Sequence, residues 1–411
     1  MKINKHCFPN GLRLVHYEDT STQMVALNIV YDVGARDEHP EHTGFAHLFE
    51  HLMFGGSAHI PDYDTPLQLA GGENNAWTNN DITNYYLTVP KPNVETAFWL
   101  ESDRMLELAF SEQSLEVQRG VVMEEFKQRC LNQPYGDVGH LFRPLAFRVH
   151  PYRWPTIGKE LSHIEQATLD EVKSFFYRFY APNNAVLAVT GNISWDETVK
   201  LTEKWFAPIP RRDVPVRQLP QEPEQTQERR LTVERNVPLD ALFMGYHMCS
   251  REGADYYAFD ILSDILSNGR SSRLNRRLVQ EQNLFSGIDA YISGTRDAGL
   301  LQISGKPAAG VSLEQAEAAV RKELEELQRS PVDGQELEKV KNKFESTQIF
   351  GNINYLNVAT NLAWFELTGK AEDIDLEVER YRSVTTEQLH TVAQRTFCES
   401  NAVVLYYKSD K

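Results

Sequence analysis

The feature that most constrains the fold of this chain is an internal duplication. The stretch at 25–33 (VALNIVYDV) is similar to the stretch at 240–248 (DALFMGYHM), with an offset of 215 residues. A second match, Asn-Ala-Val at 184–186 and again at 401–403, has nearly the same offset, 217 residues. Two matches in one register favour a single structural unit used twice over chance similarity. The sequence therefore predicts two halves of similar structure.

Capping residues and a composition change mark the boundaries of these halves. The second match follows, in both halves, a helical pattern that opens on a threonine N-cap, Thr168 or Thr385. Between the halves lies a segment rich in Pro, Gln, Glu and Arg that has no apolar periodicity. We therefore expect domains at 1–210 and 232–411, joined by a linker at 211–231.

The expected fold class is α+β. Alternating strands at 12–17, 83–89 and 300–305 are mixed with long helical patterns at 112–129 and 313–328. Hairpin signals and clustered helices favour an antiparallel arrangement over a parallel sheet. We expect two homologous halves, each an antiparallel β-sheet packed with α-helices on one face.

Composition excludes several classes of partner. The formal charge of −16 leaves no basic stripe for phosphates, so no nucleic-acid partner is expected. No apolar run reaches 18 residues, so we expect no membrane-spanning helix. The first residues lack the apolar stretch of a signal peptide, which makes the cytoplasm the default location.

The strongest local signal is the pattern His-x-x-Glu-His at His47, Glu50 and His51, inside an apolar helical stripe that ends at Gly55-Gly56. At 100° per residue, His51 lies about 40° to one side of His47 and Glu50 about 60° to the other. Both imidazoles can thus bind one ion while the carboxylate reaches its open coordination position, as a hydrolytic zinc site requires. The alternative is an amphipathic helix with a solvated polar face, but the composition predicts only roughly 0.05 chance matches to this pattern.

A third ligand is expected from the helix at 112–129, which offers Glu116, Glu124 and Glu125. Helical geometry places Glu125 inside the apolar arc formed by Leu115, Val121, Val122 and Phe126, and Glu124 outside it. Glu125 is therefore the better ligand, because a buried carboxylate without a partner would be costly. Glu124 is left as a supporting carboxylate around the ligands or a surface residue.

These motifs resemble those of the insulinase/pitrilysin family of metallopeptidases, including the members similar to mitochondrial processing peptidase. In that family the two histidines of the inverted motif are followed, about 70–80 residues on, by a glutamate ligand. The resemblance implies that His47, His51 and Glu125 bind one Zn²⁺ per chain and that Glu50 is the general base. The family usually has a further glutamate seven positions before the ligand; this chain has Gln118 there, which we expect to lie near the ligands.

The resemblance also indicates a peptide-binding strand. The stretch at 71–78 (GGENNAWT) resembles the family's substrate-binding edge strand, which implies that Asn75 and Ala76 pair with a peptide backbone. By themselves, Asn and Gly at these positions also fit a loop that leads into a strand.

The second half departs from the family pattern. The stretch at 269–274 (GRSSRL) matches a segment after which the family has an Arg and, seven residues later, a Tyr that hold the substrate; here these positions are Val279 and Ser286. The second half also has no metal motif, its matching stretch being 259–264 (FDILSD). We therefore expect a related second subunit that supplies the Arg/Tyr pair, giving a heterodimer. A homodimer is the alternative, as is a monomer that uses nearby residues instead: Arg276, Arg277 or Tyr291.

The expected function is that of a zinc metalloendopeptidase acting on peptides or unfolded polypeptides, with metal-activated water and Glu50 as the base. The alternative is a non-catalytic core or scaffold subunit that retains a metal site. The intact metal motif argues against this alternative, whereas Gln118, Val279 and Ser286 favour it.

Overall fold

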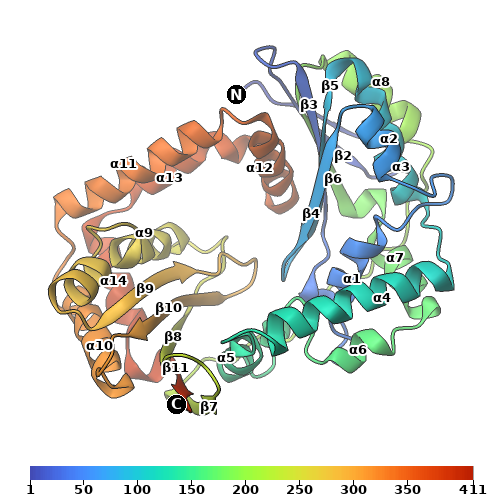
Figure 1. Cartoon of the computed structure of the whole chain (residues 1–411). Coiled ribbons are helices and arrows are strands. Elements are labelled where there is room, and N and C mark those ends of the chain that lie inside the picture. Colours follow the sequence, from blue (N-terminus) through green and yellow to red (C-terminus); the bar gives the residue numbers. More distant parts are fainter. Residues whose placement is uncertain (411) are drawn as a thin grey trace. The chain divides into compact units, whose positions relative to one another are not determined.

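A computed structural model describes residues 1–410 and divides the chain into two compact units, each built around one β-sheet (Figure 1). Unit 1 consists of Met1–Leu131, Trp154–Pro220 and Ile349–Leu376. Unit 2 consists of Asn132–Arg153, Gln221–Gln348 and Glu377–Lys411.

The sheet of unit 1 has six strands in the order β1-β2-β6-β3-β5-β4. All neighbours are antiparallel except the pair β2 and β6, which is parallel. Strand β4 is an edge strand. The strands are β1 (Asn4–Cys7), β2 (Arg13–Glu18), β3 (Met24–Tyr31), β4 (Glu73–Thr78), β5 (Thr83–Pro90) and β6 (Ala185–Gly191).

The sheet of unit 2 repeats this arrangement without a counterpart of β1. Its order is β7-β11-β8-β10-β9, and its one parallel pair, β7 and β11, corresponds to β2 and β6. The strands are β7 (Arg229–Arg235), β8 (Ala241–Met248), β9 (Phe285–Ile292), β10 (Gly299–Pro307) and β11 (Ala402–Ser409). The equal strand order confirms the expected pair of homologous halves.

Helices cover both faces of the first sheet. Helices α1, α3, α7 and α8 pack on one face and α12 on the other, and β6 is accordingly buried along its whole length. The helices of unit 1 are α1 (Phe45–Leu52), α2 (Asp64–Leu69), α3 (Val94–Leu106), α4 (Glu112–Phe126), α6 (Leu161–Glu165), α7 (Leu169–Phe179), α8 (Trp195–Trp205) and α12 (Tyr355–Thr368).

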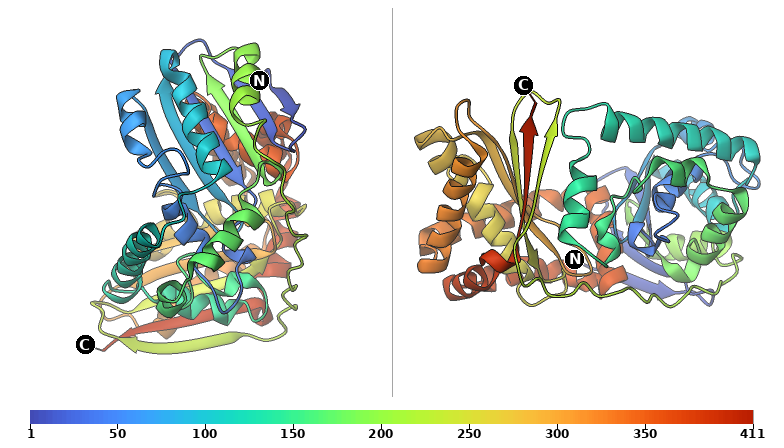
Figure 2. Two further views of the ribbon diagram at one scale, coloured as in Figure 1. Left: turned by 90° about the vertical axis from the view of Figure 1, so that its right-hand side faces the viewer. Right: turned by 90° about the horizontal axis from the view of Figure 1, so that it is seen from below.

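In unit 2, α9, α10 and α14 pack on one face of the sheet, and α5 packs on the other face (Figure 2). Gly245 on β8 permits this close approach, since a Cβ atom there would lie 2.8 Å from the ring of Phe142 on α5. The helices are α5 (Val138–Ala146), α9 (Tyr256–Ser267), α10 (Leu313–Arg329), α11 (Gly334–Gly351), α13 (Glu377–Ser383) and α14 (Thr386–Thr396).

The second face of each sheet is thus covered by a helix from the other half of the sequence. Helix α5 precedes every strand of the sheet on which it packs, and α12 follows every strand of its sheet. The compact units consequently differ from the continuous domains 1–210 and 232–411 expected from sequence. Residues 211–228 have no regular structure, and β7 begins at Arg229, inside the expected linker.

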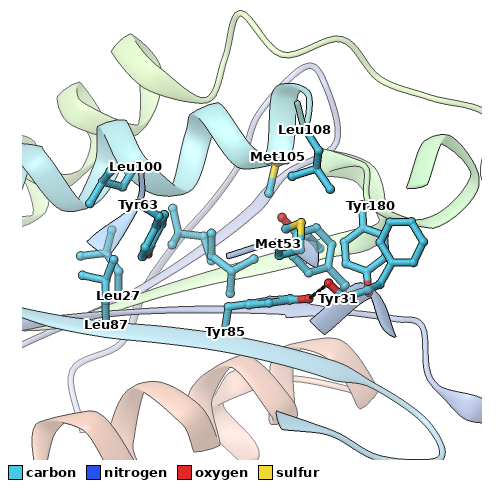
Figure 3. Packing of buried hydrophobic residues seen from close by; sticks show 14 of the residues in the cluster. Leu27, Tyr31, Met53, Tyr63, Tyr85, Leu87, Leu100, Met105, Leu108 and Tyr180 are labelled. Atoms are coloured by element: carbon cyan, nitrogen blue, oxygen red, sulfur yellow. Dashed lines mark hydrogen bonds between the residues drawn. The ribbon is translucent and has the colours of Figure 1, made fainter. Parts of the chain in front are cut away.

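The core of unit 1 lies between α1 and the sheet. Tyr31, Tyr85 and Tyr180 are fully buried there, with 5.9 Å between the ring centroids of Tyr31 and Tyr85 and 4.8 Å between those of Tyr31 and Tyr180 (Figure 3). Both expected threonine caps are also present. Thr168 accepts a hydrogen bond from the Glu171 amide at the start of α7, and Thr385 does the same for Gln388 at the start of α14.

Candidate metal centre

Helix α1 is short, and residues outside the helix hold its N-terminus in place. Its N-cap, Gly44, has φ +88°, and a Cβ atom there would lie 2.8 Å from the carbonyl oxygen of Ile157. The buried carboxylate of Glu38 accepts hydrogen bonds from the amides of Gly44 (2.9 Å) and Ala46 (2.8 Å), two donors that the helix itself cannot satisfy. Burial raises the pKa of Glu38 to about 8, although these amides favour its charged form.

His47, His51 and Glu125 come together where α1 meets α4, with His47 buried and the other two residues partly exposed. Glu125 Oε2 on α4 lies 3.6 Å from His47 Nε2 and 3.3 Å from His51 Nε2. One ligand atom from each of the three residues lies within 4.8 Å of the others, and no other such group occurs within residues 1–410. Two imidazoles and one carboxylate are a donor set that suits zinc and leaves a position for water.

The protonation states in this group favour metal binding. Burial lowers the pKa of His47 to about 4, so its imidazole is neutral at pH 7, the form that binds metals. The hydrogen bond with His51 lowers the pKa of Glu125, and Arg129 adds to this effect by contacting Glu125 Oε1 at 2.9 Å. The buried Nδ1 of His47 has no hydrogen-bond partner in the described structure.

Glu50 is close to both this group and the edge strand, since Thr78 on β4 as well as His51 and Glu125 act on its carboxyl. Burial raises the pKa of its carboxyl, while the Thr78 hydroxyl on β4 and the charge of His51 act in the opposite direction. A raised pKa moves a carboxylate toward the range in which it exchanges protons efficiently near neutral pH.

Asn75 and Ala76 lie on β4, which is paired on one side only, with β5. In this pairing Ala76 is opposite Tyr85. The amide of Ala76 donates to Asn75 Oδ1 at 2.8 Å, so this backbone donor is held by the adjacent side chain rather than by a neighbouring strand.

Gln118 and Glu124, the two residues expected around the metal ligands, lie in different environments. Gln118 is half-buried beside Gly55, at the turn that follows α1. Glu124 points to solvent, 3.7 Å from Lys127, because adjacent helical residues are about 100° apart. Of the two roles left open for Glu124, supporting carboxylate or surface residue, its exposed position fits the second. The expectation that Val121 is buried is wrong: its side chain is 47% exposed, so the buried arc of α4 is narrower than the pattern suggested.

Sequence reasoning missed three residues beside the ligands. Arg129 could have been found from its i,i+4 spacing to Glu125, although it lies in a π-helical turn, Lys127–Leu131, that continues α4. Glu38 has no such helical spacing, although it lies only six residues before Gly44, and Thr78 reaches α1 through the packing of β4 on this helix.

Within unit 2, the residues considered for gripping a substrate have other contacts. Val279 packs against the hydrophobic core, and the Ser286 hydroxyl donates to the Lys306 carbonyl oxygen at 3.1 Å. Arg277 pairs with Glu323 at 2.6 Å and also with Glu326. The two remaining residues are more exposed: Arg276, which pairs loosely with Glu281 at 3.7 Å, and Tyr291, which is 48% exposed.

The described part of the chain, residues 1–410, contains no helix with the length and apolar character needed to cross a bilayer.

Both halves of the chain match families of one peptidase class, M16. Residues 13–137 match the insulinase (peptidase family M16) family, and residues 166–344 match the family described as the peptidase M16 inactive domain. Zinc protease PqqE of Helicobacter pylori is 26% identical over 405 residues, covering 97% of this chain and 91% of that protein. The uncharacterized zinc protease YmxG of Bacillus subtilis is 25% identical over 406 residues, covering 98% of both.

Solved structures show the same architecture. The crystal structure of a protease from Helicobacter pylori superposes with a TM-score of 0.94 at 26% identity, covering 99% of both chains. A structure from Pseudomonas fluorescens, described as a peptidase M16 inactive domain, has a TM-score of 0.91 at 16% identity, which shows the shared fold. Together with the motif residues placed above, these similarities show that the chain belongs to the insulinase family, peptidase family M16.

Proposed function

We propose that this protein is a zinc metalloendopeptidase that hydrolyses peptides or unfolded polypeptides. The observation that carries the proposal is the convergence of His47, His51 and Glu125, with their ligand atoms within 4.8 Å of one another. These three side chains would hold the ion, and the adjacent Glu50 would act as the base. The zinc protease names of the relatives support the same activity.

A bound zinc ion supplies Lewis acidity and lowers the pKa of water. Glu50 takes a proton from the attacking water and later passes it to the leaving amine nitrogen. His51 and Glu125 are partly accessible, with side chains 23% and 19% exposed, so a substrate carbonyl has access to this side of α1.

The free edge of β4 offers a place for the peptide. A substrate strand that adds to this edge would replace Asn75 Oδ1 as the partner of the Ala76 amide. Main-chain pairing of this kind recognises the extended backbone of the substrate more than its side chains. It therefore suits unfolded polypeptides of varied sequence.

Full activity would also require a related second subunit that supplies an Arg and a Tyr to hold the substrate. Val279 and Ser286 stand where the family has those residues, and Arg277 is held by Glu323 and Glu326. Because holding a substrate close to the attacking group accounts for several kcal/mol of the barrier, its absence costs orders of magnitude in rate.

The test is digestion of an unstructured peptide by the isolated chain and by the chain co-purified with a related subunit, with and without a chelator. We expect about one zinc per chain by elemental analysis, chelator-sensitive cleavage, and a rate about 10²-fold higher or more with the second subunit.

Each negative result of this test would exclude a different part of the proposal. Zinc bound without cleavage in either preparation would favour the scaffold alternative. Full activity of the isolated chain, unchanged by any related subunit, would remove the need for a partner. An intact fold that binds no zinc after reconstitution would refute the proposal itself.

A further inference from the structure

Helix α3 contains three ionisable residues that are almost completely buried. Glu101 and Arg104 are each 1% exposed, and Asp103 is 8% exposed, in the stretch 99–105 (WLESDRM). Buried charges are costly unless they are paired and hydrogen-bonded, so each should have a specific set of partners. Those partners lie mainly on the segment that follows the metal-binding helix.

Arg104 and Glu101 form a bidentate ion pair, with Nε to Oε2 at 2.9 Å and Nη2 to Oε1 at 2.5 Å. The guanidinium is enclosed by aromatic rings. Its Cζ lies 5.2 Å from the ring of Phe54, 4.7 Å from that of Tyr63 and 4.5 Å from that of Tyr85. Figure 3 shows Tyr63 and Tyr85 in the core below α3. The Tyr63 hydroxyl also donates to Glu101 Oε1 at 2.6 Å.

Asp103 holds the same segment at a second point. Its Oδ2 accepts from the Ser57 hydroxyl at 2.5 Å and from the His59 amide at 3.1 Å. Its Oδ1 lies 2.7 Å from His59 Nδ1. The three α3 residues therefore contact positions 54, 57, 59 and 63, which begin two residues after the end of α1.

Tyr85 extends these contacts to both parts of the proposed active site. Its hydroxyl approaches the carbonyl oxygen of Phe49 on α1 at 3.4 Å, and its backbone pairs with Ala76 on β4. Tyr85 thus contacts Arg104 with its ring, α1 with its hydroxyl group and β4 through its backbone.

An ion pair so deeply buried is poorly explained as a source of stability. Apolar side chains of similar volume often stabilise a core as well or better, whereas in some proteins a buried polar or charged group specifies one particular arrangement. A fixed direction is what a short helix needs, because α1 spans only Phe45–Leu52 and presents its catalytic groups from its C-terminal half. Glu38 already fixes the other end.

We infer that Glu101, Asp103 and Arg104 are positioning residues that clamp the segment after α1 and thereby orient Glu50 and His51 relative to β4. The inference rests on the proposed peptidase function. None of the three reaches a reacting atom; they act through Phe54, Ser57, His59, Tyr63 and Tyr85.

The test replaces the ionic set by apolar groups of similar volume, in a Glu101→Leu, Arg104→Met, Tyr63→Phe triple variant. A closely similar set in unit 2 provides the matched control. There Arg230 pairs with Glu317 at 2.6 Å, the Tyr406 hydroxyl donates to Glu317 at 2.5 Å, and the Arg230 Cζ lies 5.0 Å from the Tyr406 ring. The control variant is Glu317→Leu, Arg230→Met, Tyr406→Phe.

Three readouts are compared between the variants: amide hydrogen exchange of residues 49–59 in the metal-free protein, zinc affinity by chelator competition, and kcat with KM. In the unit 1 variant we expect exchange about 10-fold faster or more, zinc affinity about 10–100-fold weaker and kcat about 10²-fold lower. KM should change less than kcat. The unit 2 variant should match the wild-type protein in all three.

A unit 1 variant that folds and equals the wild-type protein in exchange, affinity and kcat would overturn the inference. If it does not fold, Asp103→Asn takes its place, since it removes a charge and one acceptor but keeps the side chain's shape. We expect faster exchange of the Ser57 and His59 amides and a kcat about 10-fold lower, and unchanged values would overturn the inference. A wild-type protein without zinc or cleavage would instead refute the proposed function, while exchange in the metal-free protein would still test the clamp.

Discussion

Helices α1 and α9 occupy similar places in the two units, but within residues 1–410 only α1 carries histidines that lie close enough to a third donor to hold a metal ion. Each follows the central strand, β3 or β8, of its sheet and packs on the corresponding face. In the stretch of α9 that sequence comparison sets against the metal motif, Asp260 and Asp264 have the four-residue spacing of His47 and His51.

The acidic residues of α9 are used within the fold. Asp260 accepts a hydrogen bond from the Tyr381 hydroxyl, and Asp264 accepts one from Asn268 at 2.7 Å. Burial raises the pKa of both carboxyls. In unit 1 the third residue of the candidate metal-binding group, Glu125, lies on α4, whereas α9 packs on β9 and α14. The same scaffold thus carries either a group of metal-type donors or a helix whose acidic residues serve the fold, depending on the donors on the helix and on the element that packs against it.

Substitution of the proposed zinc ligands should have the most severe consequence, loss of the metal. His47→Ala or Glu125→Ala should abolish stoichiometric zinc binding and peptide cleavage, because each removes one of three ligands. Asp260→Ala on α9 and Glu124→Ala on α4 should keep one zinc per chain. Elemental analysis after reconstitution measures this; zinc retained by Glu125→Ala but lost from Glu124→Ala would show that the ligand is misassigned.

A Glu50→Gln variant distinguishes the proposed general base from the proposed metal ligands. Glu50→Gln should keep zinc and the fold but lower kcat by about 10²–10⁴-fold, the usual contribution of a general base. Ser263→Ala, at the corresponding place in α9, should leave kcat unchanged, since the Ser263 hydroxyl donates to the Asp260 carbonyl oxygen. Peptide turnover measures both, and a Glu50→Gln variant with wild-type turnover would exclude Glu50 as the base.

A smaller effect compares the two arginine clusters. Arg104→Ala should lower the free energy of unfolding by about 3–5 kcal/mol, because Glu101 is left buried without its cation. Arg230→Ala should lower it by about 1 kcal/mol or less, since the Arg230 side chain is 43% exposed and Arg321 still contacts Glu317 at 2.7 Å. Urea unfolding measures both, and equal losses would contradict the difference in burial.

A pair of opposite pH dependences provides a further contrast between the two units. Burial raises the pKa of Glu38 to about 8, so its contribution to stability is present below its unfolded pKa of about 4.3 and is lost as the pH rises toward 8. Although burial opposes it, hydrogen bonds from Arg230 and Tyr406 lower the pKa of Glu317 to about 2. Its contribution is present above about pH 4.3 and is lost as the pH falls toward 2.

Glutamine variants test both signs in urea unfolding of the metal-free protein. Glu38→Gln should flatten the decline of stability between about pH 4.3 and 8, and Glu317→Gln the decline between about pH 4.3 and 2. Slopes of the same sign for the two residues would contradict the assigned shifts.

Much of the fold follows from sequence pattern, and the exceptions share a cause. The strand expected at 83–89 is β5, and the helix expected at 313–328 is α10, each to within about one residue at its end. Patterns failed where a distant segment determines the environment. Val121 has the right helical angle to be buried but is exposed, and the parallel pairs β2–β6 and β7–β11 join strands far apart in the chain.

The duplication and the arrangement of His47, Glu50 and His51 on one helix follow from the sequence alone, because helical geometry places residues three and four apart on the same face. Three features depend on tertiary packing instead: Glu125 lies beside the two histidines, α5 and α12 each pack on the sheet of the other half of the sequence, and Arg104 is buried among three aromatic rings. These contacts join residues far apart in the chain. They depend on which surfaces pack together, a choice that local periodicity does not encode.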